Sequence, residues 1–202
     1  MVKVKMGNVT QRWVDVLKPF ASDYSARRTA TELSRLSGIP QQTVSRIMNH
    51  LVKLNLVSYS YEGKNKSFYL DRNKLTTGSL FVVLEGSKAI EFGLDFPRQS
   101  LVIGKMLDYC EGIVLFGSYA SGNPKRDSDL DVVFVGKCDR KKMREIIRAS
   151  PFEVHEHFVS CSEFRKNILK KTAISIEILN NHVLFGDFGK VVNVFLEGNG
   201  KS

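Results

Sequence analysis

Two aspartates follow a glycine–serine pair near the middle of the chain. An apolar run at residues 113–116 ends in Gly117-Ser118, and a polar loop follows at 119–128. Next come Asp129-Leu130-Asp131 and a second apolar run at 132–135. Because residues two apart on a strand point to the same face, Asp129 and Asp131 should project together. Neighbouring carboxylates repel each other unless a cation lies between them, and Mg²⁺ prefers oxygen ligands. The spacing therefore predicts a divalent-metal site.

The Gly117-Ser118 pair predicts a phosphate-binding turn beside that metal. It follows a strand-like run and opens a short helical segment, where backbone N–H groups and a hydroxyl can bind an anion. Lys125 and Arg126, in the loop before the aspartates, either neutralise phosphate charge or are solvated loop cations. Together, metal ligands and a phosphate-binding turn indicate chemistry on a nucleotide.

These residues resemble the nucleotidyltransferase superfamily of DNA polymerase β, in particular its small prokaryotic members, the minimal nucleotidyltransferases. The resemblance covers residues 100–187. It implies that Gly117 and Ser118 hold a nucleoside triphosphate, and that the aspartate pair holds Mg²⁺ or Mn²⁺. It further implies that a hydroxyl attacks the α-phosphorus and that pyrophosphate leaves.

The next strand, predicted at 152–159, departs from the pattern of this family. Active members place an acid there facing the aspartate pair, but the corresponding position falls near His157. Alternation puts Glu153, His155 and His157 on one face of the strand. We expect Glu153 to complete the catalytic set. Either histidine could instead act as a base, bind a softer metal or serve a structural role.

The N-terminal third predicts a helix-turn-helix followed by a hairpin. A capping box at Thr29 to Glu32 opens one helix, and Pro40 stands at the start of the next, whose apolar residues recur every three or four positions. The helices and strands are expected at residues 10–17, 29–36, 41–54, 56–61 and 67–70, with a basic turn at 62–66. This order resembles the winged helix-turn-helix domains of MarR- and ArsR-type bacterial and archaeal regulators.

That resemblance implies binding to double-stranded DNA, with the second helix in the major groove and the hairpin against phosphates or the minor groove. The candidate contacts are the polar residues of that helix and two hairpin lysines: Gln41, Gln42, Thr43, Ser45, Arg46, Asn49, Lys64 and Lys66. Charge points the same way. Residues 1–74 hold 13 Lys and Arg against 5 Asp and Glu, a net charge of +8, whereas residues 75–202 carry a net +1. A protein-contact module is the alternative.

The two patterns predict an α/β (α+β) chain with two domains. We expect a winged helix-turn-helix domain at 1–74, a partly helical connecting segment at 75–98 and a nucleotidyltransferase domain at 99–202. The connecting segment is too apolar for a flexible linker and is a candidate contact in a homodimer. The third region should form a small mixed-sheet palm, with helices on one side of the sheet and the active site on the other.

Composition limits where the chain works. No apolar run approaches the roughly 20 residues of a transmembrane helix, and the N-terminus lacks the apolar stretch of a signal peptide. Cys110, Cys138 and Cys161 form no Cys-x-x-Cys pair, and we interpret them as buried or idle thiols in a reducing cytosol. A cytoplasmic protein with no membrane partner is expected.

Two functions follow from these features. The first is a Mg²⁺-dependent nucleotidyltransferase that moves a nucleoside monophosphate from an NTP to a protein, RNA or small-molecule acceptor, with DNA bound by the winged helix. The second is a transcriptional regulator in which a weak or inactive nucleotidyltransferase fold senses a nucleotide. An antibiotic-modifying nucleotidyltransferase shares the motif but leaves the basic N-terminal domain without a role. A functional acid on the strand predicted at 152–159 would favour the first function, catalytic transfer, over the second.

Overall fold

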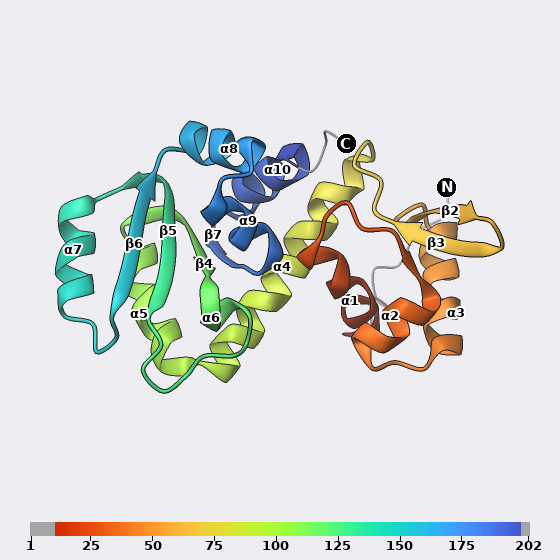
Figure 1. The fold of residues 1–202 in the computed structure, drawn as a ribbon, viewed down its shortest axis with the longest axis horizontal. Coiled ribbons are helices and arrows are strands. Elements are labelled where there is room, and N and C mark those ends of the chain that lie inside the picture. The colour runs from red at the N-terminus through yellow and green to blue at the C-terminus, as the bar shows by residue number, and fades with distance from the viewer. Residues whose placement is uncertain (1–10, 199–202) are drawn as a thin grey trace. The chain divides into compact units, whose positions relative to one another are not determined.

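The computed structural model describes residues 11–198 (Figure 1). The predicted helix start at residue 10 and the outer ends of both predicted domains lie outside this range. The chain divides into two compact units, residues 1–84 and 85–202. Helix α4 (Leu75–Asp95) runs across the boundary and fills most of the predicted connecting segment.

The N-terminal unit combines short helices with a small antiparallel sheet. Its elements before α4 are α1 (Gln11–Leu17), the 3₁₀ helix η2 (Lys18–Ser22), β1 (Arg28–Thr29), α2 (Ala30–Ser37), α3 (Gln41–Lys53), β2 (Ser58–Glu62) and β3 (Asn65–Tyr69). The strands lie in the order β1-β3-β2. Strand β1 was not predicted, because two residues are too few to show an alternating pattern.

Helix α2 begins and ends where its sequence signals predict. The Thr29 hydroxyl accepts a hydrogen bond from the Glu32 N–H, and the Glu32 carboxylate accepts one from the Thr29 N–H. Gly38 ends the helix in the left-handed region, with φ of 68°, where glycine pays no steric penalty. The chain then turns into α3, whose apolar residues Val44, Met48 and Leu51 are fully buried.

The hairpin is tighter than predicted. Glu62 pairs with Asn65, so Gly63 and Lys64 alone form the turn, and Gly63 has the positive φ that such turns require. Lys66 therefore lies on β3, and the predicted five-residue turn at 62–66 is wrong.

The C-terminal unit is a four-stranded sheet with helices. After α4 come α5 (Pro97–Leu107), β4 (Cys110–Phe116), α6 (Gly117–Ala120), β5 (Leu130–Cys138), α7 (Arg140–Arg148), β6 (Val154–Val159), α8 (Cys161–Lys170), α9 (Ala173–Asn180), β7 (Val183–Gly186) and α10 (Phe188–Gly198). The strand order is β6-β5-β4-β7; β5 and β6 are parallel and the other pairs antiparallel. The predicted mixed sheet is confirmed.

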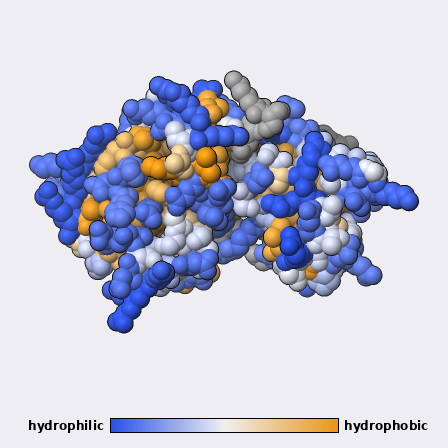
Figure 2. Space-filling view, in the orientation of Figure 1, coloured by the Kyte–Doolittle hydropathy of each residue, from blue (hydrophilic) through white to orange (hydrophobic). Residues whose placement is uncertain are grey.

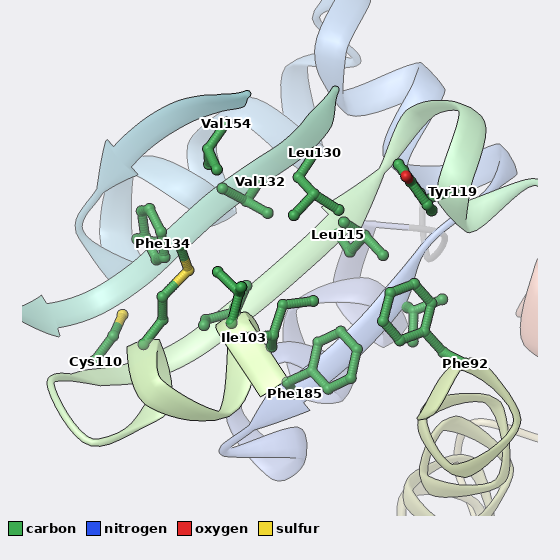
Figure 3. Close-up of a cluster of buried hydrophobic side chains, with 14 of the residues drawn as sticks. Phe92, Ile103, Cys110, Leu115, Tyr119, Leu130, Val132, Phe134, Val154 and Phe185 are labelled. Atoms are coloured by element: carbon green, nitrogen blue, oxygen red, sulfur yellow. The ribbon is translucent and has the colours of Figure 1, made fainter. Parts of the chain in front are cut away.

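Helices cover both faces of this sheet, not one face as expected. On one face, side chains such as Leu115, Leu130 and Val132 pack with residues of α5, α7 and the end of α4 (Figure 3). On the other face, α8 packs against β5 and β6 and α9 against β4, and Val114 and Val133 are buried. On this second face, Asp131 of β5 is half-buried, and His155 and His157 of β6 are exposed.

The cysteines correct the interpretation made from composition. Cys110 and Cys138 pair directly across β4 and β5, with a Cα–Cα distance of 4.2 Å, and are joined by a disulfide. Cys161 is free. Cys110 and Cys138 are 28 residues apart, and only the strand register brings them together. The reading of all three as buried or idle thiols is therefore wrong.

The face seen in Figure 2 is largely hydrophilic, with smaller hydrophobic patches among the hydrophilic residues. Within residues 11–198, none of the helices combines the length and apolar character needed to cross a membrane.

Candidate functional site

Asp131 lies on β5, between the neighbouring strands β4 and β6. It pairs with Phe116 of β4 on one side and with His155 of β6 on the other. Directly paired residues project to the same face of a sheet, so the His155 imidazole lies beside the Asp131 carboxylate. Nδ1 of His155 is 3.2 Å from Oδ1 of Asp131.

Asp129 and Glu153 approach the same imidazole from its other nitrogen. The Leu130 N–H donates to the carbonyl oxygen of Glu153 at 2.9 Å and so joins the two segments just before β5 and β6. Nε2 of His155 lies 3.6 Å from Oδ2 of Asp129 and 3.6 Å from Oε1 of Glu153. We call these four residues the carboxylate–histidine cluster: Asp129, Asp131, Glu153 and His155.

The cluster is open to solvent and rich in negative charge. The His155 side chain is 53% exposed, and that of Asp131 is 28% exposed. The hydrogen bond with Asp131 and the charges of the three carboxylates raise the pKa of His155 above its ordinary value of 6.5. This shift shows that the surrounding carboxylates favour a positive charge at this point.

The donor atoms of the cluster also suit a divalent metal. One ligand atom each from Asp129, Glu153 and His155 lie within 4.8 Å of one another. Carboxylate oxygens with an imidazole nitrogen are ligands that divalent ions accept. Asp129 and Glu153 thus meet at Nε2 of His155, whereas Asp131, the other predicted metal ligand, lies at Nδ1 and is not one of these three residues.

The register decides between the two histidines that the sequence left open. The register puts His155 opposite Asp131, whereas His157 pairs with Val133 farther along the strands. The ring of His157 lies 6.4 Å from that of Phe116. Alternation had placed both histidines on this face, but only the pairing of β5 with β6 decides which one meets the aspartates.

Gly117 couples the predicted phosphate-binding turn to the cluster. Its φ of 72° is in the left-handed region, and a Cβ at this position would overlap the Asp131 carboxylate. Any other residue would therefore strain the backbone and displace Asp131. Ser118 follows in the first turn of α6 and is half-buried.

The loop between α6 and β5 is ordered by its own hydrogen bonds. The Lys125 N–H donates to the Ser128 hydroxyl at 2.7 Å, and the Ser128 N–H donates to the Lys125 carbonyl at 3.2 Å. The side chains of Lys125 and Arg126 are exposed, and within residues 11–198 neither forms an ion pair with the cluster.

A groove of about 480 Å³ adjoins the cluster. Asp131 and His155 line it together with Phe116, His157 and Ile174. The lining therefore combines charged groups with aromatic and aliphatic ones, a combination suited to a ligand with both polar and planar apolar parts.

The candidate DNA contacts lie on α3 and the hairpin. Gln41, Gln42, Arg46 and Asn49 are exposed, as is Lys64 in the turn, while Thr43, Ser45 and Lys66 are half-buried. Nζ of Lys66 donates to Oδ1 of Asn49 at 2.7 Å and lies 4.2 Å from the centre of the Tyr59 ring. These two predicted contacts therefore bind each other and hold β3 against α3.

Two exposed tyrosines on β2 were missed from the sequence. Tyr59 is 45% exposed and Tyr61 is 63% exposed, and their rings meet edge to face. Arg27 reaches the same strand and donates to the Ser60 hydroxyl at 2.6 Å. The alternating pattern of the strand could have indicated the two tyrosines.

Comparison with known proteins supports the nucleotide chemistry of the C-terminal unit. Residues 105–185 match the protein family described as "Nucleotidyltransferase domain". The match covers less than half of the chain and includes Gly117, Asp129, Asp131 and His155. No curated protein and no solved structure gave a significant match. The α+β chain thus contains a nucleotidyltransferase domain, and the carboxylate–histidine cluster lies within it.

Proposed function

We propose that the chain is a divalent-metal-dependent nucleotidyltransferase that transfers a nucleoside monophosphate from an NTP to an acceptor hydroxyl. The observation that carries this proposal is that Asp129, Asp131 and Glu153 all lie around His155, with Asp131 against Gly117. An enzyme of this kind needs metal ligands and a phosphate-binding turn within reach of one another. The match of residues 105–185 to a nucleotidyltransferase domain supports the same reading.

Each residue of the site would have a distinct role in the transfer. Asp129, Asp131 and Glu153 would hold a divalent ion, which when bound supplies charge stabilisation at the reacting phosphate. Gly117 leaves room for the triphosphate at the turn, where Ser118 would donate a hydrogen bond to it. Glu153, at the exposed edge of the cluster, would take up the proton of the attacking hydroxyl.

Transfer can be tested with purified protein, a divalent ion and NTPs labelled at the α-phosphate. Asp129→Asn and Asp131→Asn should each abolish labelling of the acceptor, which can be the protein itself or a lysate component. Asp127→Asn is the matched control, because Asp127 lies in the same loop but outside the cluster. Labelling by the wild type that survives both substitutions in the cluster would refute the assignment.

We also propose that the N-terminal unit is a winged helix-turn-helix domain that binds double-stranded DNA. The order of α2, α3 and the β2–β3 hairpin, the exposed polar residues of α3 and the net charge of +8 over residues 1–74 support it. Arg46 would contact base edges or phosphates in the major groove, and Lys64 would contact phosphate from the hairpin turn.

DNA binding can be tested by the salt dependence of affinity for duplex DNA. Arg46→Ala and Lys64→Ala should weaken binding, and each lost phosphate contact should reduce the salt slope by about 1. Lys105→Ala removes the same charge from an exposed position in α5 and serves as the control. Equal effects from all three substitutions would indicate general charge attraction and contradict a specific interface.

A nucleotide-sensing regulator is the second candidate function. The observation that favours it is His155, which occupies the position facing Asp131 where the family resemblance predicts an acid. Such a protein would bind an NTP without consuming it, and the NTP would change its affinity for DNA. Nucleotide-dependent DNA binding without any labelled product would select this function over transfer.

A further inference from the structure

We propose that His155 is a direct metal ligand and that the cluster therefore selects a divalent transition-metal ion, such as Mn²⁺ or Co²⁺, over Mg²⁺. This inference rests on the proposed metal-dependent function and names the class of ion that the site takes.

The position of His155 supports a role in binding a ligand. Both of its ring nitrogens face carboxylates, Nδ1 toward Asp131 at 3.2 Å and Nε2 toward Asp129 at 3.6 Å. Its side chain is 53% exposed, so an ion from solvent can reach it. Pairing with Asp131 across parallel strands fixes its backbone at the cluster.

The histidine His182 shows what a structural role looks like in the same unit. Its side chain is 1% exposed, and its Nδ1 lies 2.7 Å from the Ile178 carbonyl oxygen while Nε2 lies 3.0 Å from Glu85. A histidine held in this way has no nitrogen left for an ion. His155 differs because, among the described residues, its close polar partners are carboxylates, and two of them, Asp129 and Glu153, lie at the nitrogen that would bind the metal.

The donor set argues against Mg²⁺ as the preferred ion. Mg²⁺ binds oxygen ligands in a near-ideal octahedron, whereas imidazole nitrogen suits transition ions. One nitrogen among the carboxylate oxygens of Asp129 and Glu153 therefore lowers the affinity for Mg²⁺ relative to Mn²⁺ or Co²⁺. An aspartate in place of His155 would restore an all-oxygen set.

The test measures metal binding without nucleotide. Calorimetric titration of the full chain with Mn²⁺ and with Mg²⁺ gives the ratio of the two affinities. His155→Asp should lower this preference for Mn²⁺ by at least about tenfold, the loss that even an outer-shell partner of a metal site can cause. His157→Gln is the control, because His157 lies on the same face of β6 but pairs with Val133; its ratio should stay unchanged.

A second readout is spectroscopic. Pulsed EPR of the wild type with Mn²⁺ bound should show coupling to a ¹⁴N nucleus, and His155→Asp should remove it. Bound Mn²⁺ without nitrogen coupling, or an unchanged affinity ratio in folded His155→Asp protein, would overturn the inference. If that happened while Mg²⁺ still supported transfer, the proposed function would stand. Nitrogen-coupled Mn²⁺ without transfer of any NTP would leave the inference standing and remove the function.

Discussion

At the scale of single residues, Gly117 connects the two halves of the candidate site. The same position has a left-handed backbone and lies against the Asp131 carboxylate. A side chain there would affect both the turn that is proposed to bind phosphate and the aspartate that is proposed to bind metal. The molecule contains a good comparison for separating these two effects. Gly122 has nearly the same φ, 73° against 72°, but a Cβ there meets no described atom within 4 Å.

Gly117→Ala should therefore do more harm than Gly122→Ala. Each should cost about 1–2 kcal/mol of stability from the left-handed backbone. Gly117→Ala should in addition weaken Mn²⁺ binding by about tenfold or more, because it displaces Asp131. Denaturant titration and calorimetry on both variants check this. Equal metal affinity in the two variants would contradict the coupling of Gly117 to Asp131.

The sequence allowed the residues of the cluster to be predicted only in part. Alternation places Asp129 and Asp131 on one face, since this depends on local geometry alone. Alternation also places Glu153, His155 and His157 together on the next strand. Which of them meets Asp131 depends on the register in which β5 pairs with β6. The residue spacing within each strand is the same in every register, so it cannot show which register forms.

At the scale of elements, two helices begin with the same device. Ser160 and Glu163 form a capping box at the start of α8, as Thr29 and Glu32 do at α2. Hydrogen bonds from the N–H and hydroxyl of Ser160 lower the pKa of Glu163 below its ordinary value of 4.5, and those of Thr29 do the same for Glu32. Both helices follow directly from the sequence because the signal is confined to four neighbouring residues.

The capping box of α8 predicts how the free energy of unfolding depends on pH in the acid range. Because the pKa of Glu163 is lower in the folded state, the unfolded chain takes up its proton first as the pH falls. The stabilisation is therefore complete above about pH 4.5 and is lost below it as the pH falls through the folded-state pKa. Glu163→Gln should reduce the fall in unfolding free energy between pH 5 and acid conditions, measured by urea titration. A pH profile identical to that of the wild type would contradict the prediction.

Helix α4 contributes to a buried ionic group that was not predicted from the sequence. Glu85 is fully buried and contacts Lys88 at 2.9 Å and His182 at 3.0 Å. His182 is distant in sequence, so only the packing of α4 in the C-terminal unit brings the three together. Burial opposes ionisation of Glu85, but charge interactions and hydrogen bonds with His182 and Lys88 outweigh it and hold the pKa of Glu85 below its ordinary value, while burial lowers the pKa of His182.

Glu85→Gln should consequently be costly. Removing the charge of Glu85 breaks its ionic contact with Lys88, and breaking a buried ion pair costs about 3–5 kcal/mol. Lys142 and Glu145 form an exposed pair with the same i,i+3 spacing and a similar distance, 3.0 Å. Glu145→Gln should cost less than about 1 kcal/mol. Urea titration of the two variants at neutral pH checks the comparison, and similar losses would show that burial of Glu85 is not decisive.

At the scale of the whole molecule, we propose a homodimer in which an apolar surface of the C-terminal unit is the contact. Ile90, Leu94 and Leu101 are 68%, 76% and 70% exposed. A Cβ at Gly93 would lie 3.5 Å from the Ser100 hydroxyl, so α4 and α5 are close together at this point. Exposed apolar side chains on adjoining helices are typical of surfaces that associate.

Leu94→Glu should then shift the protein from dimer to monomer. A charge at the centre of an apolar contact is desolvated without a partner when the contact forms. Light scattering after size-exclusion chromatography measures the mass, and Lys105→Glu is the control for an added negative charge on α5. A wild-type monomer, or a dimer unaffected by Leu94→Glu, would contradict the proposal.

The central claim is that this chain moves a nucleoside monophosphate from an NTP to an acceptor. The most direct measurement incubates the protein and acceptor with Mn²⁺ or Mg²⁺ and each NTP, labelled in parallel at the α- and the γ-phosphate. If the chain carries out this transfer, the acceptor retains the α-label and the γ-label leaves in pyrophosphate. Both signals should be lost in Asp131→Asn. Retention of the γ-label, or bound NTP with no labelled product under any of these conditions, would contradict the claim.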